Sequence, residues 1–320
     1  KAYKLLINAM RDDIKKGVKN IEFDELDKFG FRQLQAPIEA LNMVYPSITL
    51  DEQFEKGIVS TKITEPSDYD PRSTMVGKRG MRTVMNYTDD STKKIPRKYL
   101  FSYKPEVQAK YGRIFSPEKI GEYSAKISSI IQTIKKSKGI VLIYSQYIDG
   151  GVVPMALALE ELGLTRYGSS SNTTSLFETP PTEQIDSLTL KPKSQVENFK
   201  PAQYVMITGD KSFSPNNAED IKTVTSENNK NGEVVKVILI SKAGSEGLDF
   251  KCIRQVHILE PWYNLNRIEQ IVGRGVRQKS HCLLPFNERN VEIYLHSTVL
   301  LETPEQEAVD VYVYRLAKNK

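Results

Sequence analysis

Five short strand-like runs constrain the fold of this chain more than any other feature of its sequence. They are residues 139–145, 204–208, 234–241, 255–260 and 290–299. The first, GIVLIYS, is rich in β-branched residues and shows no alternation of apolar and polar positions, which predicts a strand buried on both faces. Helical segments separate most of the runs. This order predicts an α/β fold, with a mainly parallel sheet and helices on both faces.

Capping residues mark the predicted helix boundaries. Ser116, followed by a proline, predicts the start of a helix that continues to about Lys136. The segment VVPMALALEEL is predicted to be a helix that stops at Gly163. Another helix is predicted to open at Ser214, which also precedes a proline, and to end near residues 231–232.

The last predicted helix, which begins near Asn264, carries the most specific side-chain pattern. Its apolar positions share the face that would dock on the sheet, and they are Leu265, Ile268, Ile271, Val272 and Val276. The opposite row is Gln270, Arg274 and Arg277, at positions i, i+4 and i+7, with Arg267 beside it. Guanidinium groups are planar donors that stay charged, so this row suits a polyanion. Two of them three residues apart predict arginine fingers for a γ-phosphate in the transition state.

Two glycines distinguish this row from a merely solvated basic face. Gly273 and Gly275 each cost about 1 kcal/mol in a helix interior relative to alanine. A solvated helix has no need of them, whereas the close approach of a ligand or of a neighbouring backbone requires glycine.

A glycine-containing loop, SKAGSEGLDF at residues 241–250, directly follows the run at 234–241. Ligands of open α/β sheets bind beyond the carboxyl ends of strands. Gly244 and Gly247 would let the backbone approach a phosphate or a sugar, and Asp249 offers a carboxylate for a ribose hydroxyl. Taken alone, such a loop is a weak signal and is more often a structural turn. It gains weight from lying just before the arginine helix.

Together these two segments resemble motifs V and VI of superfamily 2 helicases, because SKAGSEGLDF is followed by EPWYNLNRIEQIVGRGVRQ with matching order and spacing. The variant resembles Swi/Snf-type ATPases, and still more the helicases of large cytoplasmic DNA viruses. The supporting segments are RQLQAPIEALNMVYPS, VLIYSQYIDGGVVPMALALEELG as motif IV, and SHCLLPFNERNVEIYLHSTVL. The likeness covers residues 110–320 well and 30–50 loosely. It implies the second, C-terminal RecA-like lobe of an ATP-driven motor that moves along nucleic acid.

The resemblance also implies a role for each matching residue. Gln270, Arg274 and Arg277 would be catalytic, and Gly247 and Asp249 would bind the nucleotide. The residues implied to touch the nucleic-acid backbone are Ser145, Gln146, Thr208, Gly209, Ser241 and Lys242. Such contacts follow phosphates and carry little base information. Gly273 stands where Swi/Snf-type enzymes usually have Asp, so strand separation and translocation without separation both stay open.

A phosphate loop, G-x-x-x-x-G-K-[ST], does not occur in the sequence, nor does an acidic Mg²⁺ motif after a hydrophobic strand. We therefore expect ATP and Mg²⁺ to be bound mainly by a first RecA-like lobe of the same protein, and this chain alone to be inactive. The expected partners are nucleic acid, DNA ahead of RNA, that first lobe and the transcription machinery. No membrane partner and no metal site within this chain are expected.

The composition agrees with an intracellular protein, in the host cytoplasm or the virion if the source is a virus. No run of about 18 apolar residues occurs, and two cysteines, Cys252 and Cys282, argue against a disulfide-built secreted domain. The net charge of +5 permits phosphate binding without requiring it. We expect two regions: a helical and irregular insertion at 1–110, and the RecA-like domain at 111–320. Residues 168–200 are predicted to be a long surface loop.

Two other functions compete with the motor lobe. One is a non-catalytic nucleic-acid-binding or protein-docking module that kept the fold and lost the motor; retention of Arg274 and Arg277 argues against it. The other is an unrelated α/β nucleotide-binding enzyme, for which the sequence contains neither G-x-G-x-x-G nor a nucleophile elbow.

Overall fold

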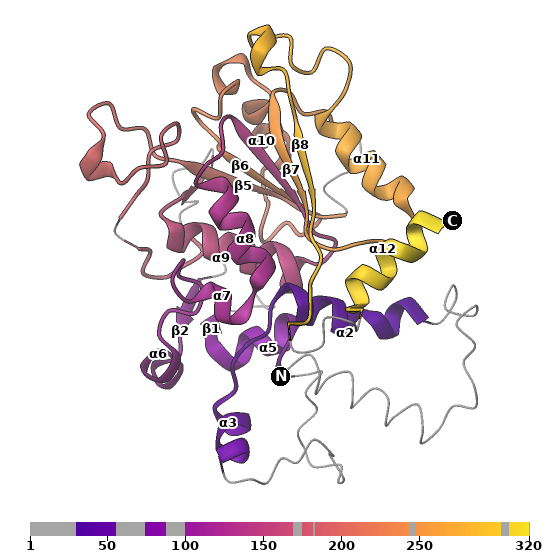
Figure 1. Cartoon of the computed structure of the whole chain (residues 1–320). Coiled ribbons are helices and arrows are strands. Elements are labelled where there is room, and N and C mark those ends of the chain that lie inside the picture. The colour runs from indigo at the N-terminus through magenta and orange to yellow at the C-terminus, as the bar shows by residue number, and fades with distance from the viewer. Residues whose placement is uncertain are drawn as a thin grey trace.

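A six-stranded sheet with strand order β4-β5-β6-β3-β7-β8 forms the centre of the molecule (Figure 1). The computed structural model describes residues 30–55, 74–87, 100–168, 175–181, 183–242, 248–301 and 307–319. Each neighbouring pair of strands in this sheet is parallel. The strands are β3 (Ile140–Tyr144), β4 (Thr165–Arg166), β5 (Gln203–Ile207), β6 (Val237–Ile240), β7 (Ile253–Ile258) and β8 (Glu292–Leu295). The predicted parallel α/β class is confirmed, and only β4 was not anticipated.

Helices cover both faces of the sheet. On one face, α8 (Ala125–Ile134) and α9 (Val153–Leu162) pack in one hydrophobic cluster with alternate residues of β3, β5 and β6. On the other, α10 (Asn217–Val224) and α11 (Leu265–Gly275) pack with the remaining alternate residues. All five residues of β3 are buried, which explains why its sequence shows no alternation. Within the described residues, no helix is long and apolar enough to cross a bilayer.

Two predicted helix starts are wrong, and hydrogen bonding explains both. Ser116 lies in a series of turns before a short helix, α7 (Ile120–Tyr123), and the N-cap of α8 is Ser124, whose hydroxyl accepts the Ile127 amide. Ser214 does not open α10, since its hydroxyl accepts the Thr208 amide across a turn. That helix also ends at Val224, earlier than predicted. By contrast, α9 ends as predicted at Gly163, whose φ of 107° is left-handed.

The described residues before 110 share a hydrophobic core with the sheet domain. They form α2 (Gly30–Asn42), α3 (Ile48–Glu55), α5 (Gly77–Val84), α6 (Pro105–Tyr111) and an antiparallel pair, β1 (Met85–Tyr87) and β2 (Phe101–Tyr103). Tyr45, Met81 and Phe101 belong to the same buried cluster as α8 and α9. The boundary at 110/111 stays a prediction. Next to α2 lies α12 (Val309–Asn319), a terminal helix that the sequence patterns did not indicate (Figure 1).

The described part of 168–200 differs from the predicted surface loop. Leu176, Phe177 and Ile185 are buried. The carboxylate of Glu160, on α9, accepts hydrogen bonds from the Leu176 amide at 2.7 Å, the Phe177 amide at 3.2 Å and the Tyr204 hydroxyl at 2.7 Å. The buried carboxylate of Glu160 thus holds the start of this polar, proline-rich segment against the domain.

A one-turn π-helix, η2 (Ile148–Val152), follows β3 and fits there because it contains glycine. A Cβ added to Gly151 would lie 1.9 Å from Ser145 Oγ and 2.7 Å from Ser145 Cβ. The turn therefore packs directly against Ser145, the residue that follows β3, and any side chain at residue 151 would push Ser145 away.

We predict that Gly151→Ala lowers the free energy of unfolding by about 1–3 kcal/mol, the usual effect of overpacking a close contact. Urea denaturation measures it. Gly273→Ala is the matched control, because a Cβ there would meet no described atom within 4 Å. Alanine is favoured over glycine by about 1 kcal/mol in a helix, so this control is expected to be neutral or stabilising. A Gly151→Ala variant as stable as wild type would contradict the close-contact account.

Candidate functional site

Four polar residues stand at the carboxyl ends of four adjacent strands. Thr208 follows β5, Ser241 follows β6, Ser145 follows β3, and Glu260 lies two residues after β7. The registers Ile207↔Ile240, Tyr144↔Ile240 and Tyr144↔Ile258 align these ends along one edge of the sheet. This is the edge at which open α/β sheets bind ligands.

The three hydroxyl residues on this edge point into the protein. Ser145, Thr208 and Ser241 are each no more than 2% exposed. Thr208 Oγ1 lies 2.6 Å from Ser214 Oγ, and Ser145 Oγ donates to Glu260 at 2.9 Å. Their side chains are therefore buried in this conformation, and their predicted contact with the nucleic-acid backbone stays a prediction.

The residue after each hydroxyl is the one that reaches the surface. Gly209 and Lys242 are exposed, whereas Gln146 is half-buried and its Nε2 is buried, without a hydrogen-bond partner among the described residues. A buried hydroxyl residue is thus followed by a less buried residue on three adjacent strands, and by an exposed one on two of them. Ser241 Oγ, also without a described partner, is the one hydroxyl of the three that stays free.

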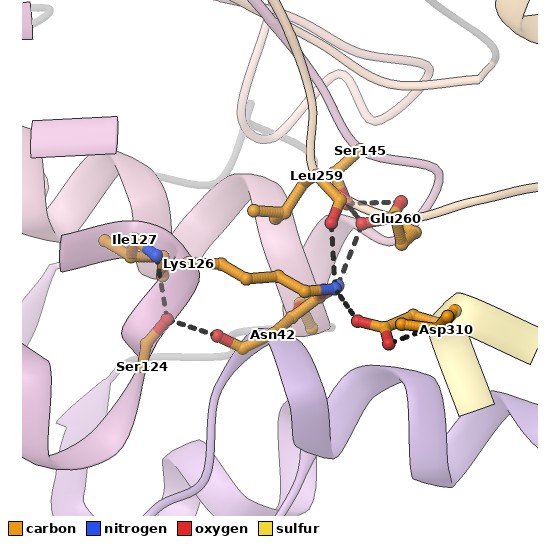
Figure 2. Close-up of polar contacts among 10 residues, drawn as sticks. Asn42, Ser124, Lys126, Ile127, Ser145, Leu259, Glu260 and Asp310 are labelled. Atoms are coloured by element: carbon orange, nitrogen blue, oxygen red, sulfur yellow. Dashed lines mark hydrogen bonds and ion pairs between the residues drawn. The ribbon is translucent and has the colours of Figure 1, made fainter. Parts of the chain in front are cut away.

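Sequence reasoning missed Glu260, the most connected polar group on this edge (Figure 2). Its buried carboxylate accepts from Ser145 Oγ at 2.9 and 3.0 Å, from the Gln146 amide, and from Asn42 Nδ2 at 2.8 Å. Lys126 Nζ donates to the Leu259 carbonyl at 3.0 Å and to Asn42 Oδ1 at 3.2 Å. A glutamate directly after an apolar strand was the available signal.

Two charges balance the region around Glu260. Lys126 Nζ lies 2.9 Å from Asp310 Oδ2, and both side chains are almost fully buried. Desolvation raises the pKa of Glu260 to about 7, although the Gln146 amide, Lys126, Ser145 and Asn42 oppose that shift. The carboxylate therefore carries a partial charge near neutral pH, in a position where burial penalises it.

The predicted nucleotide residues converge in part. Arg277 Nη1 lies 2.7 Å from Asp249, whose side chain is 57% exposed. Arg274 Nη1 donates to the Leu248 carbonyl at 3.2 Å and lies 3.9 Å from Asp249 Oδ1. Gln270 is exposed on α11, one turn before Arg274. Two cations and a carboxylate thus face one accessible surface, an arrangement that suits a phosphorylated sugar.

The predicted helical row needs one correction. α11 ends at Gly275, so Arg277 lies beyond the helix rather than at its position i+7. For the same reason Val276 does not join the apolar face and is 45% exposed, whereas Ile268 and Ile271 are buried as predicted. The chain turns after Gly275, and this turn brings Arg277 to Asp249.

The two glycines of α11 have different environments. A Cβ on Gly275 would lie 3.3 Å from Ile253, so this glycine allows the helix to approach β7. Gly273 faces open space among the described atoms, and the close approach predicted for it has no counterpart there. Gly244 and Gly247 lie outside the described residues. In the described ranges no three His, Cys, Asp or Glu side chains gather as metal ligands.

One aromatic residue near this edge was also not predicted as part of the site. Trp262, the single tryptophan of the chain, lies under two cations, with Arg267 Cζ at 3.9 Å and Lys242 Nζ at 5.8 Å from its ring centroid. The indole thereby holds Lys242 close to the chain that follows Glu260.

Comparison with known proteins identifies the domain. Residues 193–279 match the family described as the helicase conserved C-terminal domain. The chain is 35% identical over 194 residues to the termination factor NPH-I homolog of African swine fever virus, covering 55% of this chain and 26% of that protein. It is 31% identical over 202 residues to the putative ATP-dependent RNA helicase L538 of Acanthamoeba polyphaga mimivirus, covering 63% and 35%. The chain therefore spans about a quarter to a third of these relatives' length.

A solved structure is also similar. The C-terminal part of the Fun30 ATPase domain aligns with a TM-score of 0.47 and 14% identity, covering 100% of this chain and 83% of that one. Residues 193–279 are thus similar to the helicase conserved C-terminal domain, and they lie in a parallel α/β sheet domain with helices on both faces. The chain's relatives are viral helicase-like proteins, so the resemblance found in the sequence is confirmed.

We predict that Glu260 makes stability fall as pH rises from about 4.5 to 7. Its pKa is raised in the folded chain, so the folded state binds the proton more tightly than the unfolded state does, and folding is favoured most below the unfolded value. The contribution is at most about 3 kcal/mol. Urea denaturation across this pH range measures it. In Glu260→Gln the slope is expected to be shallower, and parallel profiles for the two proteins would refute the assignment.

Proposed function

We propose that this chain is the second motor lobe of an ATP-dependent nucleic-acid helicase or translocase. The observation that carries the proposal is the convergence of Arg274 and Arg277 on Asp249 at an accessible surface, within a helicase C-terminal domain. The names of the viral relatives, a termination factor homolog and a putative helicase, support a role in viral transcription or genome handling.

Arg274 and Arg277 would act as arginine fingers on the γ-phosphate. Because Arg277 is 51% exposed, its ion pair with Asp249 is worth about 1 kcal/mol or less and is exchanged readily for a phosphate. Released from Arg277, Asp249 would accept a ribose hydroxyl. Gln270, which is exposed on α11 one turn before Arg274, and Gly247 would complete this half of the nucleotide cleft.

The edge of the sheet at the carboxyl ends of β3, β5 and β6 would contact the nucleic-acid backbone. Gly209 and Lys242 are exposed and Gln146 is half-buried, and amide groups and a lysine suit phosphate contacts. Ser145, Thr208 and Ser241 would support them from inside. We propose DNA ahead of RNA, and a relative named as an RNA helicase makes RNA the comparison to test.

Activity would require a partner lobe. The described residues offer cations and one ribose-binding carboxylate, but no cluster of carboxylates for Mg²⁺. We propose that a first RecA-like lobe supplies the phosphate loop and the Mg²⁺ site, that ATP binds between the lobes, and that this chain alone hydrolyses no ATP. A complex with transcription machinery, and a location in the host cytoplasm or virion, belong to the same proposal.

The second candidate is a binding or docking module without catalysis. It is favoured by the present pairing of the arginines, since Arg274 holds the Leu248 carbonyl and Arg277 holds Asp249. In that case both guanidinium groups would only brace the segment before Phe250.

We predict that Arg277→Ala, in a protein containing both lobes, reduces nucleic-acid-stimulated ATP hydrolysis by about 10³–10⁵-fold, the usual range for an arginine finger. Steady-state ATPase assays with single-stranded and duplex DNA measure the loss. Arg315→Ala is the matched control, because Arg315 forms a comparably exposed ion pair, 2.8 Å from Glu307, on α12. Wild-type protein without stimulated hydrolysis, or an Arg277→Ala variant as active as the control, would favour the docking module.

We also predict that this chain binds DNA with an affinity that falls as salt rises, and that Lys242→Ala lowers the slope of log K against log salt by about 1, as for the loss of one phosphate contact. Fluorescence anisotropy at several salt concentrations measures it. Lys136→Ala, at an exposed position near the other end of β3, is expected to leave the slope unchanged. Equal slopes for all three proteins would exclude Lys242 from the interface.

A further inference from the structure

We propose that Glu260 is a positioning residue for nucleic acid, whose buried carboxylate sets the main chain at Ser145 and Gln146 so that Gln146 faces the phosphate backbone. The inference rests on the proposed nucleic-acid function of this edge. It concerns a residue that touches no nucleic acid itself and acts through its neighbours.

The carboxylate fixes the chain at the point where β3 ends. Glu260 accepts both the Gln146 amide and the Ser145 hydroxyl, and that hydroxyl in turn accepts the Tyr147 amide at 3.2 Å. Three successive residues are thus tied to one side chain. Gly151 closes the other side of Ser145, as its missing Cβ shows. The segment therefore has little freedom to change direction after the strand.

Elements far apart in the sequence hold the carboxylate itself (Figure 2). Asn42, the last residue of α2, donates to Glu260 at 2.8 Å and accepts from Lys126 at 3.2 Å. This orients the Asn42 amide, because its oxygen faces the cation and its nitrogen faces the carboxylate. Lys126, on α8, is in turn paired with Asp310, on α12, at 2.9 Å. Three helices thus determine where the acceptor of the Gln146 amide lies.

Stability alone does not account for this network. A buried ionic cluster is commonly no more stable than well-packed apolar residues of the same volume. Burial also raises the pKa of Glu260, so the ionised carboxylate is penalised where it stands. The groups that face it are Lys126 from α8, Asp310 and Tyr314 from α12, and Tyr144 and Tyr147 at the end of β3. Lys126 is the one cation among them, and it favours the ionised form.

A second buried carboxylate in the same chain provides a matched control. Glu160 is 2% exposed and Glu260 is 1% exposed. Each accepts main-chain amides and hydroxyl groups, and the pKa of each is raised by burial. Glu160 lies on α9 and holds residues 175–177, next to neither Ser145 nor Gln146. The two therefore share their chemistry and differ in what they position.

The experiment compares Glu260→Gln with Glu160→Gln in the 320-residue chain. In Glu260→Gln a donor replaces one acceptor, so either Asn42 or Gln146 loses its partner. Each variant is first shown to be folded by circular dichroism and urea denaturation. Binding of fluorescein-labelled single-stranded DNA, duplex DNA and single-stranded RNA is then measured by anisotropy, at several pH values from 5.5 to 8.5.

We expect Glu260→Gln to weaken binding about tenfold, which corresponds to roughly 1.4 kcal/mol, and Glu160→Gln to bind like wild type. The pH dependence of wild-type binding is expected to include a component near pH 7 that Glu260→Gln lacks and Glu160→Gln keeps. Equal affinity of Glu260→Gln and wild type would overturn the inference, while the proposed function would stand. Equal weakening by both variants would also overturn it, because the role would then be only structural.

A wild-type chain that binds none of the three probes at low salt would overturn the proposed function, and this inference with it. If Glu260→Gln does not fold, Asp310→Asn decides, because it removes the ion pair that holds Lys126 and so loosens the Asn42 amide that orients the carboxylate of Glu260. Weaker binding by folded Asp310→Asn, with Glu160→Gln unchanged, supports the inference. Unchanged binding by Asp310→Asn overturns it.

Discussion

The buried carboxylate of Glu260 is the point on which the functional edge of this domain depends. It receives the amide and the hydroxyl at the end of β3, and Asn42 joins it to Lys126 and through Lys126 to Asp310. A buried acceptor of this kind is stable only where several donors converge on it. Asn42 of α2 and the end of β3 supply those donors, and α8 and α12 hold Asn42 in place through Lys126 and Asp310. The packing of distant helices therefore fixes the direction of the segment after β3.

The parallel sheet explains why such an edge exists. Its strands run in the same direction, so all of their carboxyl ends lie together, and each chain must leave the sheet at the same side. Three of these exits use a buried hydroxyl followed by a less buried residue. At two of them the hydroxyl accepts a backbone amide of the turn, since Ser145 accepts the Tyr147 amide and Thr208 accepts the Asp210 amide. The pairing of Arg277 with Asp249 arises differently, because the turn after α11 brings Arg277 to Asp249.

Much of the fold was predictable from local patterns. The apolar runs of β3, β5, β6 and β7 and the end of α9 at Gly163 were anticipated, because both-sided burial and a left-handed C-terminal residue leave clear traces in sequence. Helix starts were less predictable, since Ser116 and Ser124 are both acceptable N-cap residues and only the packed structure selects Ser124. The helix α12 and the burial of residues near Leu176 depend on partners far away in the chain, so no local pattern indicated them.

The sequence by itself determined the fold class of the domain and indicated Gln270, Arg274, Arg277 and Asp249 as candidate site residues, because these depend on residue type and on spacing within one or two elements. Only the tertiary structure decided how they are arranged. It placed Arg277 beyond the helix and beside Asp249, it directed Ser145 and Thr208 inward, and it made Glu260 the common acceptor of donors from α2 and from the end of β3. The physical reason is that a buried polar group must find its partners in three dimensions, and those partners come from segments up to 218 residues apart.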